Sequence, residues 1–138
     1  MVNLALYLLL MSKQIIITAA VFGMLAVIAG AFGAHGLKAY LTPQQLDVWH
    51  TAVQYQFYHV FALLFLSTFT RFKSSLITAS YYLFTFGIIF FSGSLYFLAC
   101  ADVLKWSWLS IMGPITPLGG LLFIIGWITL GLAALKNK

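Results

Sequence analysis

The sequence predicts an all-α integral membrane protein, a four-helix bundle with both termini in the cytoplasm. The chain of 138 residues has only seven Lys or Arg and two Asp or Glu, and 63% of it is hydrophobic. Soluble domains carry about a quarter charged residues, so one of this size could not cover its surface with so few. Apolar runs recur that are long enough, at about 20 residues each, to cross a bilayer. We therefore expect a single domain, residues 1–138, made of spans and short connections.

The first apolar run extends from Gln14 to Ala34 and predicts a span over residues 14–34. The preceding residues 1–11 are also apolar, but Lys13 interrupts the run, and we expect Met11 to be the natural start. An alternative is a cleaved signal peptide ending near the small residues Ala29-Gly30-Ala31. Such a peptide would begin with a basic cluster, which this segment lacks.

A start signal marks the second helix. Thr42 can be the N-cap, Pro43 fills the first helical position, and Gln45 completes a capping box. A helix from here to Thr70 would be about 42 Å long, more than the roughly 30 Å of the hydrocarbon core. We expect the span to cover about residues 51–70 and the first turns to extend beyond the outer face.

The two remaining spans follow short connections. The connection of residues 71–74 is so short that the third span, residues 75–99, must lie antiparallel to the second. Pro117 falls near the beginning of the last apolar segment, where a missing backbone donor is tolerated, and the fourth span runs over residues 117–135.

Charge placement predicts the orientation. Lys38 and Lys105, which fall on one side of this arrangement, are each accompanied by an Asp. The larger basic group falls on the other side and consists of Lys13, Arg71, Lys73, Lys136 and Lys138. Because loops rich in Lys and Arg stay in the cytoplasm, both termini are expected inside.

Small residues recur at intervals of seven in three of the spans. They are Gly23 and Gly30, then Ser80, Gly87 and Ser94, then Gly119, Gly126 and Ala133. Such seams let helix backbones approach closely in lipid, which predicts tight left-handed packing or self-association through these faces. Glycine is also common in membrane helices for other reasons, which is the alternative interpretation.

Several motifs lie at the ends of these spans. They are residues 30–37 (GAFGAHGL), Trp49, Thr51, Ala52, Tyr55, Gln56 and His59, residues 91–96 (FSGSLY), residues 115–120 (ITPLGG), and Gly126-Trp127. In this combination the chain resembles the membrane family called domain of unknown function 423, over nearly everything after Met11. The resemblance implies a small multi-pass protein of the bacterial inner membrane, and it brings no catalytic residue or cofactor.

In the expected topology these motifs meet in the outer leaflet. Tyr55, Gln56 and His59 are spaced by three and four residues, which predicts one helical face turned to the bundle interior. The candidate ligand-binding residues are His35, Tyr55, Gln56, His59, Ser92, Ser94, Tyr96 and Thr116. Alternatively, His59 is a neutral imidazole that joins helices by bonding Gln56, Ser92 or a backbone carbonyl.

The chain lacks the side chains that most catalytic reactions require. The chain has no Glu, and both Asp residues fall outside the spans, so a carboxylate proton relay is not expected. Its one cysteine forms no internal disulfide and no Cys-rich metal motif. Bis-histidine haem binding through His35 and His59 has no support from their spacing. No run of basic residues is long enough for a nucleic-acid partner. We expect no enzyme activity, no cofactor and no metal.

Two functions remain. The first is a non-catalytic accessory or assembly subunit of a membrane complex. The second is a binder or carrier of a small apolar ligand, a lipid or a quinone, in an outer-leaflet cavity. The lipid bilayer is the expected partner in either case, with other membrane subunits added in the first.

Overall fold

The computed structural model describes residues 4–69, 74–105 and 112–136, and in this part of the chain every regular element is helical. The α-helices are α1 (Leu4–Ala31), α2 (Pro43–Thr68), α3 (Ser75–Gly87), α4 (Gly93–Ala99), the short α5 (Ala101–Leu104) and α6 (Ile115–Lys136). Two π-helical segments, η1 (Phe32–Gly36) and η2 (Ile88–Ser92), complete the set. The all-α prediction is confirmed.

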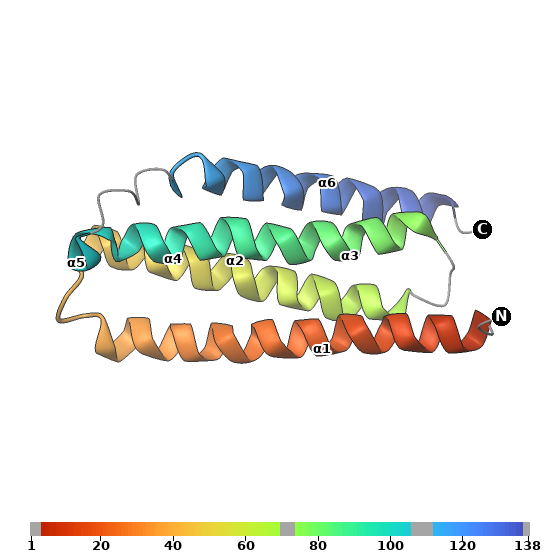
Figure 1. Ribbon diagram of the computed structural model, residues 1–138, viewed down its shortest axis with the longest axis horizontal. Coiled ribbons are helices and arrows are strands. Elements are labelled where there is room, and N and C mark those ends of the chain that lie inside the picture. The colour runs from red at the N-terminus through yellow and green to blue at the C-terminus, as the bar shows by residue number, and fades with distance from the viewer. Residues whose placement is uncertain (1–3, 70–73, 106–111, 137–138) are drawn as a thin grey trace.

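These elements form long rods lying side by side (Figure 1). Helix α1 continues into η1, and α3, η2 and α4 follow one another without a break. The start of α1 and the end of α6 lie at the same end of the bundle (Figure 1). Helix α1 packs against α2, α3 packs against α6, and α2 also contacts η2 and α4. Helix α2 therefore links the α1–α2 pair to the rod formed by α3, η2 and α4.

Three helical segments are long and apolar enough to cross a membrane: Leu9–Gly36, Ser75–Ala99 and Ile115–Lys136. Helix α2 is long enough but does not reach the same hydropathy, because Gln54, Gln56 and His59 interrupt its apolar residues. The protein is thus an all-helical membrane protein with three candidate spans among its described residues.

The start of α2 confirms the predicted capping box. The backbone N–H of Thr42 donates to Gln45 Oε1 at 2.9 Å, and the backbone N–H of Gln45 donates to Thr42 Oγ1 at 3.3 Å. Gln45 Nε2 also donates to Asp102 Oδ2 at 2.6 Å, which ties this helix start to α5. Residues 70–73, 106–111 and 137–138 lie outside the described residues, and with them the predicted short connection and three of the basic residues used for orientation.

The first helix begins earlier than the predicted span. It is helical from Leu4 and turns π-helical at Phe32, whereas the sequence predicted residues 14–34. Lys13 does not interrupt the helix, because its side chain is exposed and no packing contact has to accommodate the charge.

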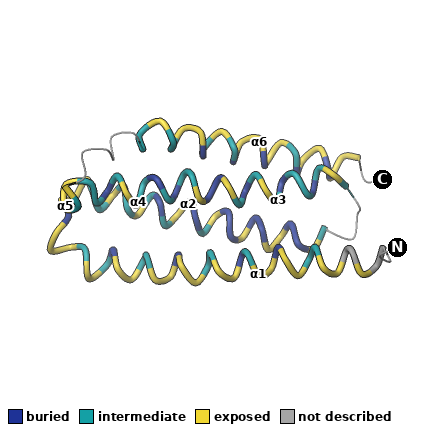
Figure 2. Tube along the Cα trace, viewed as in Figure 1, coloured by how far each residue is buried: buried dark blue, intermediate teal, exposed yellow. Residues whose placement is uncertain are grey.

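Burial is concentrated on α2 and on the facing sides of α3 and α6 (Figure 2). Much of α1 is exposed, since this helix packs on α2 and its other faces are free for lipid. The core consists of Ile15, Ala19, Val60, Ala62, Leu63, Leu66, Ile77, Phe84, Ile88, Phe123, Leu130 and Ala133.

Glycines of the seven-residue seams lie at helix contacts, as predicted. A Cβ at Gly87 would lie 2.5 Å from Cδ1 of Phe123, and one at Gly126 would lie 2.7 Å from Cε1 of Phe84. A Cβ at Gly119 would collide with the backbone of Phe91. These three glycines therefore pack inside the bundle, at the contact between the α3–η2 rod and α6.

Candidate functional site

Gln56 ties three helices together at the middle of the bundle. Its Nε2 donates to the backbone carbonyl of Phe22 at 2.8 Å, and its Oε1 accepts from the hydroxyl of Tyr96 at 2.9 Å. The side chain is buried. Phe22 lies at the middle of Leu9–Gly36, a segment apolar enough to cross a membrane, and an unpaired amide in such surroundings would be costly.

His59 is buried between α2 and α6, with 4% of its surface exposed. Its ring stacks on Phe123 with centroids 3.4 Å apart and planes at 6°. Nδ1 lies 2.8 Å from the carbonyl oxygen of Tyr55, and Nε2 accepts from Trp127 Nε1 at 3.3 Å. A carbonyl only accepts and an indole N–H only donates, so the geometry fits a neutral imidazole with its proton on Nδ1. This is the bonding expected of a ring that joins helices.

Gln56 and His59 are both buried on the interior side of α2, but they contact different helices. Gln56 reaches α1 and α4, whereas His59 reaches α6. Side chains three residues apart on a helix point in directions that differ by about 60°. Because α2 has neighbouring helices on several sides, this difference is enough for the two side chains to contact different helices. The predicted single cluster is divided between two interfaces.

The remaining candidates are also dispersed. Ser94 Oγ lies 2.7 Å from Thr116 Oγ1 and donates to the carbonyl of Phe91, which joins α4 to α6. Ser92 is 1% exposed, and its hydroxyl has no hydrogen-bond partner within the described part of the chain. His35 is exposed on η1, where Nδ1 lies 3.2 Å from the carbonyl of Ala31 one turn earlier. Residue by residue, the eight candidates form pairs and single residues rather than one site.

Three further interhelical contacts were not anticipated. They join Thr18 Oγ1 to the Tyr81 hydroxyl at 2.9 Å, Ser80 Oγ to Thr129 Oγ1 at 2.8 Å, and Trp49 Nε1 to the Ala29 carbonyl at 2.8 Å. The available signal was the presence of hydroxyl groups inside apolar runs, since such groups tend to bond across helices in membranes. Their pairing could not be read from the sequence, because it depends on which helices are neighbours.

The indole of Trp49 can reach α1 because Gly33 of η1 has no side chain in its way. A Cβ at Gly33 would lie 2.6 Å from Cδ1 of the indole. The same ring packs on Tyr96, with centroids 4.6 Å apart. Trp49 and Tyr96 thereby form an aromatic wall between the first helix and the α4 rod.

Beside this wall lies an apolar pocket of about 370 Å³, between α1–η1 on one side and η2–α4 on the other. It is lined by Phe22, Leu25, Ile28, Ala29, Phe32, Trp49, Gln56, Ile88, Ile89 and Tyr96. Both π-helical segments contribute to it, and such segments are frequent at functional sites. Of the candidate residues predicted from the sequence, Gln56 and Tyr96 line the pocket, and the other six do not.

The polar side chains of the pocket are already engaged. Gln56 bonds Phe22 and Tyr96, and the indole N–H of Trp49 bonds Ala29. The remaining wall is hydrocarbon and aromatic carbon. Within the described residues, no group of three or more His, Cys, Asp or Glu side chains is close enough to hold a metal ion.

Long apolar helices joined by buried polar bridges define a multi-pass helical protein of a bacterial membrane. Residues 29–120 match the family described as a protein of unknown function, DUF423, and the chain belongs to this family, as its motifs indicated. A UPF0382 membrane protein of Staphylococcus epidermidis is 46% identical over 124 residues, which is 90% of this chain and 97% of that protein. The UPF0382 membrane protein YwdK of Bacillus subtilis is 46% identical over 127 residues, covering 90% and 98%. No solved structure matches this chain.

Proposed function

We propose that this protein is a non-catalytic membrane bundle that binds the hydrocarbon chain of a lipid or isoprenoid in the pocket between α1–η1 and η2–α4. The observation that carries the proposal is the chemistry of the pocket wall. It is apolar, and its polar groups hydrogen-bond protein atoms. A ligand that needs several hydrogen bonds would find few free partners, whereas an alkyl or prenyl chain needs none.

The size of the pocket supports the same occupant. A volume of about 370 Å³ lies within the range of roughly 300 to 1,000 Å³ typical of small-molecule sites. Along α1 the lining extends from Phe22 to Phe32, which is about 15 Å at the helical rise. That is half of the roughly 30 Å hydrocarbon core, so the pocket matches the chain length of one leaflet.

The proposal includes a topology. Helix α2 is taken as a fourth span, because its least apolar residues, Gln56 and His59, are buried and hydrogen-bonded inside the bundle and need not face lipid. Both termini are placed in the cytoplasm, which puts the pocket in the outer leaflet and extends the first turns of α2 beyond the outer face. The positive-inside rule supports this orientation.

A substitution that fills the pocket tests whether it binds a hydrocarbon chain. The variant Ala29→Phe adds an aromatic ring inside the pocket and leaves the carbonyl that Trp49 bonds. Val27→Phe is the matched control, because Val27 is 61% exposed on the same helix and does not line the pocket. Protein purified in mild detergent is analysed for bound lipid by native mass spectrometry. We expect wild type and Val27→Phe to retain a lipid or prenyl compound and Ala29→Phe to lose it. Equal retention by both variants would contradict the proposal.

A role as accessory subunit of a membrane complex is the second candidate. It is favoured by the broad exposed face of α1, including Met24 and Val27, since this helix packs chiefly on α2 and leaves room for another subunit. The same purification separates the two candidates. A protein partner retained in fixed stoichiometry supports the accessory role, whereas retained lipid with no protein partner supports binding of a hydrocarbon chain in the pocket.

A further inference from the structure

Gln54 lies on the outward face of α2, and the proposed topology places it close to the middle of the bilayer. The bond between Gln56 and Phe22 places position 56 of α2 level with the middle of the segment Leu9–Gly36. Two residues of helix correspond to about 3 Å, so Gln54 is about 3 Å from that level. Its side chain is exposed, unlike that of Gln56.

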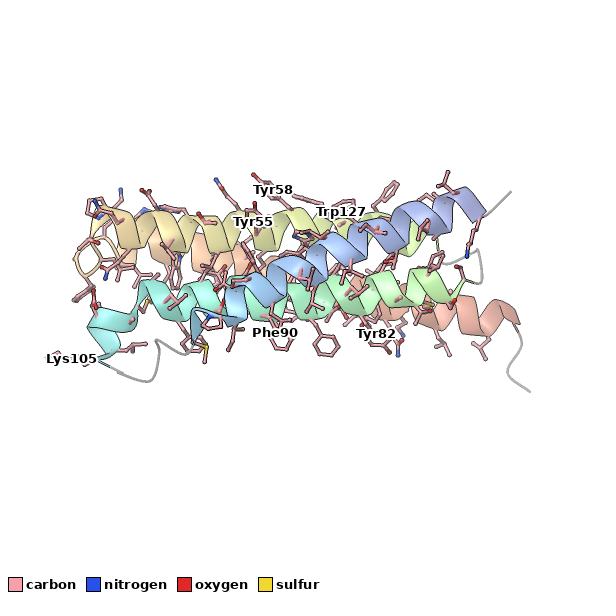
Figure 3. The ribbon with its side chains drawn as sticks, turned by 90° about the horizontal axis from the view of Figure 1, so that it is seen from above. Tyr55, Tyr58, Tyr82, Phe90, Lys105 and Trp127 are labelled. Carbon is pink, nitrogen blue, oxygen red and sulfur yellow. The ribbon has the colours of Figure 1, made fainter. Side chains whose placement is uncertain are left out.

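This amide forms no hydrogen bond with any other residue that the structure describes. Tyr58, one turn further along α2, is 56% exposed, and within the same residues its hydroxyl is also unpaired. Figure 3 shows Tyr58 at the edge of the molecule formed by α2, whereas Phe90 and Tyr82 project from the opposite side. Unpaired polar groups are unfavourable in contact with hydrocarbon, so this face of α2 is poorly suited to contact lipid alone.

The exposed groups follow the spacing of a helix-packing seam. The residues are Asp47, Thr51, Gln54, Tyr58, Phe61 and Phe65, separated by steps of four and three. All are exposed or half-buried, so the stripe is open along the length of α2. Alternating steps of three and four keep one stripe facing a partner helix in left-handed packing.

We propose that this stripe, residues 47–65 of α2, is the interface of a homodimer, with Gln54 bonding Gln54 of a second copy. Copies inserted in the same orientation have position 54 at the same depth. Their two-fold axis is then parallel to the membrane normal, which brings equivalent residues of α2 together. A side-chain amide both donates and accepts, so two of them satisfy each other without any other group. A different protein would need its own polar side chain at that depth.

The interface differs from the one suggested by the small-residue seams. Gly87, Gly119 and Gly126 are occupied by contacts between the α3–η2 rod and α6. The stripe left open on α2 carries three aromatic side chains and the Gln54 amide, with Asp47 and Thr51 toward the start of the helix. Amide pairing is a known source of helix association in membranes, and polar groups at such positions fix the register of the partners.

Cysteine crosslinking in membranes tests the dimer. In a Cys100→Ser background, Phe61→Cys places a thiol on the stripe and leaves Gln54 in place. Phe86→Cys is the matched control, because Phe86 is also an exposed phenylalanine near the middle of its rod, on α3. We expect oxidation to give a disulfide-linked homodimer with Phe61→Cys and only background crosslinking with Phe86→Cys.

The role of the amide is tested in the same background. Adding Gln54→Leu to Phe61→Cys should lower the dimer association constant about fivefold or more, as expected from the loss of an interhelical hydrogen-bond pair in a membrane. Gln54→Asn, which keeps an amide, should retain crosslinking above that of Gln54→Leu. Equal crosslinking of Phe61→Cys and Phe86→Cys would overturn the proposal. So would crosslinking to a different protein, or no effect of Gln54→Leu.

Discussion

Individual polar side chains decide how the apolar helices are placed relative to one another. Burial of apolar groups gives little driving force between helices in lipid, so a few hydrogen bonds and close contacts must supply specificity. Gln56 links α2 to α1 and α4, and His59 links it to Trp127 on α6. Each of these groups could have been singled out from the sequence as a polar residue in an apolar run. Their partners depend on the bundle.

We predict that His59 and Trp127 are energetically coupled. His59→Leu leaves the indole N–H without its acceptor, and Trp127→Phe removes that N–H but keeps an aromatic ring. Each single variant should lower the melting temperature in detergent. The double variant should cost less than the sum of the two, because hydrogen bonds of this kind are worth about 0.6 kcal/mol on average and up to about 1.7 kcal/mol in membranes. Strictly additive losses would show that the 3.3 Å contact contributes nothing.

At the scale of elements, the glycines of the seams allow the close approach of the α3–η2 rod and α6. Gly119 lets the backbone of α6 approach that of η2 at Phe91, and Gly126 accommodates the ring of Phe84. The period of seven predicted these contacts from the sequence. Neither π-helical segment was predicted, because nothing in the local residues of η1 or η2 distinguishes them from ordinary helix.

Two glycines of α6 provide a matched test of the seam. Gly126→Leu would insert a side chain where a Cβ alone already lies 2.7 Å from Phe84, and overpacking of this kind typically costs about 1 to 3 kcal/mol. Gly131→Leu is the control, since a Cβ at Gly131 meets nothing within 4 Å. We expect a thermal-shift assay in detergent to show a clear loss for the first variant and none for the second. Equal stability of the two variants would exclude packing through this face.

The two ends of the bundle differ in the charged residues that they carry. The beginning of α1 and the end of α6 share one end, and η1, α5 and the start of α2 share the other (Figure 1). Asp47 and Asp102 belong to the second end, whereas Lys13 on α1 and Lys136 on α6 lie toward the first. This asymmetry is the basis of the proposed orientation.

We predict that Lys38 is outside the cell and Lys136 inside. Single cysteines at these positions, in a Cys100→Ser background, are treated with a membrane-impermeant maleimide in intact cells and again after permeabilisation. Lys38→Cys should react in both conditions and Lys136→Cys only in the second. Reaction of Lys136→Cys alone in intact cells would invert the topology and move the proposed binding pocket to the inner leaflet.

The sequence by itself determined the all-helical membrane class, the family, the capped start of α2 and the glycine contacts. These follow from composition, from local hydrogen bonding at a helix start and from a repeat along one helix, all of which act over a few residues. Only the tertiary structure decided that Gln56 and His59 serve different interfaces, that Trp49 and Tyr96 wall a pocket, and that Gln54 faces outward. Those features depend on which helix lies beside which, and that arrangement is set by contacts between residues far apart in the chain.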